Sequence, residues 1–231
     1  MKRFYKHVTV APSGDGFQVM LDGRGIKTAR GAAQVMPTQA LAEALAAEWA
    51  AQGEEIDTAS FVLRDLADYA IDVVAPDAAA AVGELVPYAE TDTLCYRADE
   101  GEPLHERQVA VWEPLLLAAE HRWDIHFERI SGIIHRPQPA ETLARMETVL
   151  LAESAFALAA LKMLTSLSAS LVIALAAIAP DADTTALWNA ANLEEDWQAE
   201  LWGKDEMAEE RRAIRLAAFE AAMRFAALAR G

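Results

Sequence analysis

The sequence has one cysteine among 231 residues, Cys95. A single cysteine excludes an internal disulfide and a thiolate metal site, and it fits a protein of a reducing compartment. Cys95 lies between Leu94 and Tyr96, in an apolar string. We therefore expect a buried structural thiol at this position rather than a nucleophile.

Basic side chains are also few. The chain has 20 Lys and Arg against 36 Asp and Glu, which gives a formal net charge of -16. Because proteins bind nucleic acid largely through Lys and Arg on phosphates, we expect no nucleic-acid partner. Residues 1–35 differ, with six basic and two acidic side chains, whereas the remainder has 14 basic and 34 acidic ones. This asymmetry predicts two surfaces with different roles.

Long uninterrupted apolar runs are missing as well. The two apolar runs, residues 150–161 and 171–179, are separated by Lys162 and by a patch of Thr and Ser. Neither run is long enough to span a bilayer, so we expect no membrane insertion. Runs that are apolar on nearly every side must be enclosed, which predicts a helical core. The amino terminus lacks the apolar stretch of a signal peptide, and we expect a soluble protein of the cell interior.

Motifs that carry enzymatic chemistry are absent from the sequence. It has no phosphate-binding P-loop, no G-x-G-x-x-G dinucleotide motif and no G-x-S-x-G nucleophile elbow. None of the five histidines are four residues apart, the spacing that places two metal ligands on one helix face. We expect no catalytic residue, no metal and no cofactor.

The first part of the chain predicts a small antiparallel meander followed by helices. Residues 17–21 alternate in the period-2 pattern of a half-buried strand, and Asp22-Gly23 supplies a hairpin turn after them. Thr38 is placed to cap a helix that ends near Gly53. The expected strands are 4–10, 17–21, 26–28, 93–97 and 124–130, and the expected later helices of this part are 60–74, 78–88 and 103–123.

The strand at 93–97 could return to the meander sheet, and Pro114 is expected to kink or split its helix. Pro137 and Pro139 mark a boundary, after which the predicted helices are 140–164, 168–179, 184–201 and 205–229. The predicted fold class is α+β. An amino-terminal β-meander and helix domain, 1–135, precedes an all-α helical domain, 136–231.

An acidic segment stands out near the carboxyl terminus. Residues 181–210 contain ten acidic side chains and one basic side chain. On a continuous helix, Ala190, Leu193, Trp197 and Leu201 form one apolar stripe. Two interpretations stay open: a solvated face, or a docking patch for a basic surface of a protein partner. Trp197 is expected in the core, and Trp202 is expected to be partly exposed.

Seven strings of the sequence together resemble the family of assembly chaperones for ATP synthase. In chain order they are RFYK (3–6), LDGR with IKT (21–28), AEW and the following Gln (47–52), TDTLCYR (91–97), QVAVWEPLL (108–116), SLVIALA (170–176) and WQAELWG (197–203). The resemblance implies a non-enzymatic chaperone that binds the unassembled alpha subunit of ATP synthase. It would shield the apolar surface that faces the beta subunit and release the alpha subunit on assembly.

The resemblance also implies where the client binds. The acidic region of the family corresponds to Glu194, Glu195, Asp196 and Glu200, and its EW motif to Glu48 and Trp49. With Trp202 nearby, these residues form the client-binding hypothesis. The family implies a bacterial cytoplasmic protein, with eukaryotic relatives in the mitochondrial matrix, and we expect a monomer. The competing hypotheses are a non-catalytic scaffold subunit and an enzyme with an unrecognised acidic site.

Overall fold

The structure is a computed structural model that describes residues 1–132, 135–203 and 205–231. The chain forms two compact units, one of Met1–Ala78, Ser154–Ala160 and Ala221–Gly231, the other of Ala79–Glu153 and Leu161–Glu220. The sequence predicts consecutive domains 1–135 and 136–231. The predicted domains are consecutive in the sequence, whereas the two compact units alternate along the chain. Whether 1–135 and 136–231 fold independently stays a prediction.

The first unit contains a small antiparallel sheet, as predicted. Its strands are β1 (Val8–Ser13), β2 (Gly16–Leu21), β3 (Arg24–Gly25) and β4 (Val35–Met36). The order is β1-β2-β3, and β4 also pairs with β2. In the β1–β2 hairpin Val8 pairs with Leu21 and Ser13 with Gly16. Alternate residues of β2 face the core, which confirms the period-2 prediction for residues 17–21.

The Asp22-Gly23 turn joins β2 to β3. Both residues have positive φ, 49° and 78°, which is the conformation that two-residue hairpin loops need. The predicted strand limits 4–10 and 26–28 are wrong, because β1 begins at Val8 and β3 ends at Gly25. Lys27 instead forms an isolated bridge with Ala33. A strand of two residues such as β4 leaves no periodic signal in a sequence, so it was not predicted.

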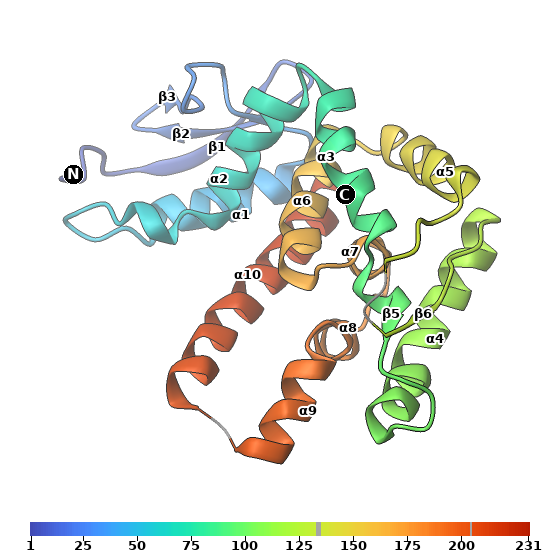
Figure 1. The fold of residues 1–231 in the computed structure, drawn as a ribbon. Helices are drawn as coiled ribbons and strands as arrows, with labels where there is room; N and C mark the ends of the chain where they lie inside the picture. Colours follow the sequence, from blue (N-terminus) through green and yellow to red (C-terminus); the bar gives the residue numbers. More distant parts are fainter. Residues whose placement is uncertain (133–134, 204) are drawn as a thin grey trace. The chain divides into compact units, whose positions relative to one another are not determined.

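Helix α1 (Gln39–Ala50) packs on β1 and β2 (Figure 1). The Thr38 hydroxyl caps it by accepting a hydrogen bond from the Leu41 N–H at 3.1 Å, as predicted. Leu41 and Leu45 are fully buried against the sheet. The predicted helix 60–74 consists of a 3₁₀ turn (η1, Thr58–Ser60), α2 (Val62–Tyr69) and a π-helical turn (η2, Ala70–Val74).

The second unit begins with α3 (Ala78–Glu90), of which residues from Ala79 onward belong to it. A 3₁₀ turn (η3, Thr93–Cys95), β5 (Tyr96–Arg97), α4 (Pro103–Trp123) and β6 (Ile130–Ser131) follow. β5 pairs in parallel with β6. The expected return of residues 93–97 to the meander sheet is therefore wrong. Most of the predicted strand 124–130 is wrong too, and Pro114 does not split α4.

The remaining helices are α5 (Ala140–Leu151), α6 (Ala155–Ser168), α7 (Leu171–Ala177), α8 (Thr184–Ala191), α9 (Leu193–Trp202) and α10 (Glu206–Arg230). Two predicted helices, 140–164 and 184–201, are each divided into two. The second division falls at Asn192, where φ of -111° and ψ of 17° depart from helical values, and its backbone N–H and side-chain amide both donate to the Trp188 carbonyl, at 3.1 and 2.8 Å. The predicted apolar stripe is therefore not continuous.

Asp92 fixes the start of α7 inside the second unit. It is fully buried, and its carboxylate accepts hydrogen bonds from the Val172 N–H at 3.0 Å and the Leu94 N–H at 3.1 Å. The first of these bonds satisfies a donor at the amino terminus of α7. Burial nevertheless raises the pKa of Asp92 from 3.8 to about 6, against the effect of these hydrogen bonds.

The raised pKa predicts how stability changes with pH. As pH rises, the unfolded chain loses its Asp92 proton near 3.8, before the folded chain does near 6. The stabilisation from this group is therefore present at low pH and lost between these values. Compared with Asp92→Asn, which does not titrate, the wild-type advantage in unfolding free energy should shrink from about pH 4 to about pH 7.

Urea unfolding of both proteins across this range measures the difference, and exposed Asp15→Asn is the matched control. An advantage that grows with pH would show that the hydrogen bonds outweigh burial. The control variant removes one carboxylate from an exposed turn and so measures the effect of the change in net charge by itself.

Candidate functional site

The acidic residues predicted to bind a client lie on α9, in the second unit. Glu194, Glu195 and Asp196 occupy its first turn, where carboxylates interact favourably with the helix dipole. Gly203, with φ of 91°, ends the helix. Residue 204 lies outside the described residues, and α10 follows from Glu206 (Figure 1).

Each of the four carboxylates has a partner on a neighbouring helix. Glu200 accepts two hydrogen bonds from the Arg107 guanidinium on α4, at 2.6 and 2.8 Å. Asp196 binds Arg212 on α10 in the same bidentate way, with one distance of 2.9 Å. The remaining pairs are Glu195 with Arg215 at 3.1 Å and Glu194 with the Gln108 amide at 2.7 Å. The repulsion between like charges on α9 is thereby offset.

The Arg107–Glu200 pair shows this effect on both groups. Hydrogen bonding to Glu200 raises the pKa of Arg107, and hydrogen bonding to Arg107 lowers the pKa of Glu200. Arg107 also lies over the Trp197 ring, 5.7 Å from its centroid. Trp197 is half-buried rather than a core residue, which corrects the prediction made for it.

The apolar residues around the helix end are exposed. Trp202 is 84% exposed, which confirms the prediction of an exposed aromatic, and Leu201 is exposed beside it. Met207 and Ile214 on α10 are exposed as well. An open cavity with a volume of about 530 Å³ lies between α9 and α10, and Trp202 and Arg212 both line it.

Sequence reasoning missed the basic half of this site. Arg107 lies 93 residues from Glu200, and Arg212 lies 16 residues from Asp196. The arginines at 211, 212 and 215 follow the acidic segment directly, and this change of charge sign was an available signal.

Glu48 and Trp49 belong to the other compact unit and are placed on α1. The Glu48 carboxylate accepts hydrogen bonds from the Leu63 N–H at 2.7 Å and the Arg64 N–H at 2.9 Å, at the start of α2. Burial raises the pKa of Glu48, although these hydrogen bonds lower it. Trp49 is buried between Tyr5 and Phe61. Both residues thus make internal contacts.

The other candidates for chemistry are placed as follows. Cys95 is buried, and burial raises the pKa of its thiol, so the thiolate form is disfavoured. Among the described residues, no three His, Cys, Asp or Glu side chains lie together as a metal site. Within the same residues, no helix combines the length and the hydropathy needed to cross a bilayer.

The contacts of Glu48 predict a loss of stability when its carboxylate is removed. Glu48→Ala leaves two amide donors of α2 without their acceptor and should lower the unfolding free energy by about 1–2 kcal/mol. Urea unfolding measures the change, with the exposed Glu43→Ala on the same helix as control. If the two variants are equally stable, the cap contributes nothing and Glu48 is available for another role.

Comparison with known proteins agrees with the resemblance seen in the sequence. A family model described as ATP12 chaperone protein matches residues 2–120. The crystal structure of Atp12 from Paracoccus denitrificans is 36% identical, covers 99% of this chain and 98% of its own, and superposes with a TM-score of 0.92.

Two further relatives extend the comparison. The Atu1473 protein of Agrobacterium tumefaciens is 39% identical with a TM-score of 0.92, over 97% of this chain and 85% of that one. Mitochondrial protein atp12 of Schizosaccharomyces pombe is 24% identical over 90% of this chain and 76% of its own length. Because the family model spans more than half of the sequence and solved relatives share more than a third of their residues with it, the chain belongs to the ATP12 chaperone family.

Proposed function

We propose that this protein binds the unassembled alpha subunit of ATP synthase, shields the apolar surface that faces the beta subunit, and releases the alpha subunit on assembly. Membership of the ATP12 chaperone family supports a role in ATP synthase assembly and a non-enzymatic activity. A subunit taken from its oligomer exposes apolar surface that its neighbour normally covers. A chaperone for it needs an exposed apolar surface of its own.

The exposed apolar residues of α9 and α10 are the observation that carries this proposal. Leu201, Trp202, Met207 and Ile214 are exposed around the junction of the two helices. Exposed apolar side chains that lie together mark interaction sites, and tryptophan is enriched among the residues that dominate interface energies. We infer that Trp202 is the centre of the client contact.

The charged residues beside Trp202 favour a contact that can be reversed. Glu195, Asp196 and Glu200 already have arginine partners, so a basic client surface must exchange with those arginines rather than fill vacant positions. Such an exchange gains little net electrostatic energy, whereas the long-range field of the acidic segment still accelerates the encounter. A mixed apolar and polar interface of this kind suits a temporary complex.

The same pairing makes acid–base catalysis by this cluster unfavourable. A carboxylate held by two arginine hydrogen bonds is stabilised in its charged form, so it neither donates nor accepts a proton readily near neutral pH. The lowered pKa of Glu200 is the clearest case. This argues for the chaperone over an enzyme with an acidic site.

Removal of the Trp202 side chain should weaken protection of the client. The Trp202→Ala variant should need about tenfold more protein than the wild type to suppress alpha-subunit aggregation. Light scattering measures the aggregation. The melting temperature should change little, because an exposed side chain contributes little to stability. Leu117→Ala, which removes an exposed apolar side chain from α4, is the matched control. Equal protection by the two variants would contradict the assignment of Trp202.

Removal of negative charge from α9 should slow the encounter with the client. Glu195→Gln with Glu200→Gln should slow association with the alpha subunit by about threefold to tenfold at low salt. Dissociation should be nearly unchanged, because each Gln amide oxygen still accepts a hydrogen bond from its arginine and α9 keeps its position. The difference should disappear at about 1 M salt, where charges are screened within ~3 Å. Surface plasmon resonance measures both rates. Glu141→Gln with Glu147→Gln on α5 makes the same change of net charge, and an equal effect from it would assign the slowing to net charge alone.

A further inference from the structure

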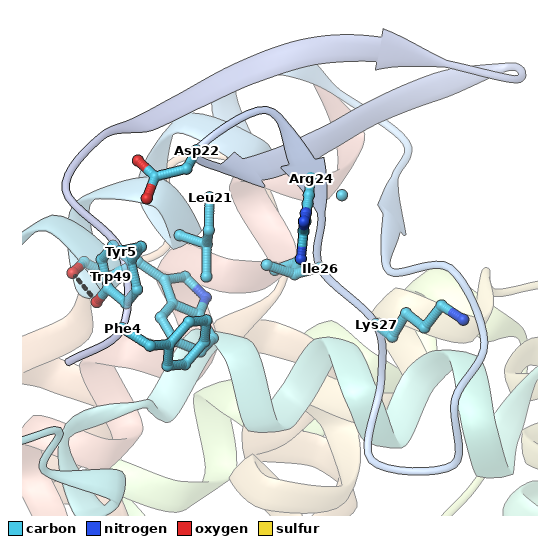
Figure 2. Close-up of a pocket in the computed structure, with 9 residues that line it drawn as sticks. Phe4, Tyr5, Leu21, Asp22, Arg24, Ile26, Lys27 and Trp49 are labelled. Atoms are coloured by element: carbon cyan, nitrogen blue, oxygen red, sulfur yellow. Dashed lines mark hydrogen bonds between the residues drawn. The ribbon is translucent and has the colours of Figure 1, made fainter. Parts of the chain in front are cut away.

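A cavity of about 550 Å³ opens in the unit that contains the sheet, next to β3. Phe4, Tyr5 and Trp49 form its aromatic side, Leu21 its apolar base, and Arg24 and Lys27 its basic side (Figure 2). These residues come from the amino-terminal segment, the β2–β3 hairpin, the residues that follow β3, and α1. No residue of the α9–α10 site takes part in it.

The aromatic side combines two buried rings with one exposed ring. The Tyr5 hydroxyl donates to the Trp49 carbonyl at 2.6 Å, and the two rings meet edge to face with centroids 5.6 Å apart. Phe4 packs on Tyr5, yet it is 64% exposed. An exposed side chain changes rotamer freely, so Phe4 is able to turn aside for a ligand.

The indole nitrogen of Trp49 is an independent indication of a ligand. Trp49 is 8% exposed, and within the described part of the chain its Nε1–H has no hydrogen-bond acceptor. Figure 2 shows this nitrogen on the side of the ring turned toward Ile26 and Arg24. A buried donor without an acceptor is unfavourable, so an incoming acceptor oxygen would gain a hydrogen bond that the free protein lacks.

The charge of the cavity selects the ligand. Arg24 and Lys27 are exposed, and among the described residues neither has an ion pair or a side-chain hydrogen bond. The Asp22 carboxylate is turned to the preceding segment, where it accepts hydrogen bonds from the Lys6 and His7 N–H groups. The cavity therefore favours an anionic ligand, in agreement with the positive balance of residues 1–35.

We propose that this cavity binds an extended acidic segment of the client polypeptide. An apolar side chain of the segment packs beside Phe4, and a carbonyl oxygen accepts the indole hydrogen bond of Trp49. Its carboxylates pair with Arg24 and Lys27. This inference rests on the proposed function, to which it adds a second client contact of opposite charge.

The arrangement fits a peptide better than a phosphate group. Figure 2 shows the Arg24 and Lys27 side chains set apart from each other, with the nitrogen of Lys27 directed away from the aromatic residues, so the two cations do not converge on one point. Phosphate sites instead gather cations and backbone N–H groups around a single anion. An aromatic wall with separated cations matches an extended chain, in which carboxylates are spaced along the backbone and apolar side chains alternate with them.

The test measures affinity for purified alpha subunit by biolayer interferometry, with the full-length chain. Arg24→Glu with Lys27→Glu should weaken binding by about tenfold or more. The control, Lys2→Glu with Arg136→Glu, makes the same change of net charge at exposed positions outside the cavity and should change affinity less than about threefold. Thermal unfolding confirms that both variants are folded.

Each outcome decides one point. If the wild type binds the alpha subunit and the two double variants bind equally well, the cavity is not a client contact, although the proposed function stands. If inorganic phosphate at about 10 mM displaces the client from the wild type but not from the Arg24 and Lys27 variant, the cavity is a phosphate site and the peptide assignment is wrong. If the wild type fails to bind the alpha subunit, the proposed function and this inference are both wrong.

Discussion

Arginine–carboxylate pairing holds α9 in place, and the exposed tip of that helix depends on it. Of the ten residues of α9, all described by the structure, Leu193 is the buried one, so apolar packing alone does not fix the helix. Its carboxylates instead bind Arg107 on α4 and Arg212 and Arg215 on α10. Bidentate pairs of this kind define orientation as well as distance. They orient the helix whose end carries Trp202.

In this arrangement the charged residues and the apolar residues have different roles. The ion pairs orient α9 and leave a field that attracts basic partners, whereas the apolar residues at the helix end provide contact area. Exposed ion pairs exchange partners at little net cost because water and salt screen them. An apolar contact surrounded by such pairs suits the temporary client complex that we propose.

The aromatic–basic cavity beside β3 has the opposite charge and belongs to the other unit. Its aromatic residues also contribute to stability, since Tyr5 and Trp49 are buried with α1 against the sheet. Glu48, their neighbour, caps α2 with both carboxylate oxygens. The adjacent residues Glu48 and Trp49 thus differ in role: one satisfies backbone donors, and the other retains an indole donor that nothing described in the chain accepts.

The sequence by itself determined the elements with a strong local cause. Strand β2, the Asp22-Gly23 turn, the Thr38 cap and the exposure of Trp202 before Gly203 were all predicted, because alternation, positive φ, side-chain capping and a helix end are local properties. Resemblance of short strings predicted the family. Tertiary structure alone decided the pairing of β5 with β6 and the arginine partners of α9. These depend on contacts between residues as much as 93 positions apart, which no local pattern of charge or hydropathy encodes.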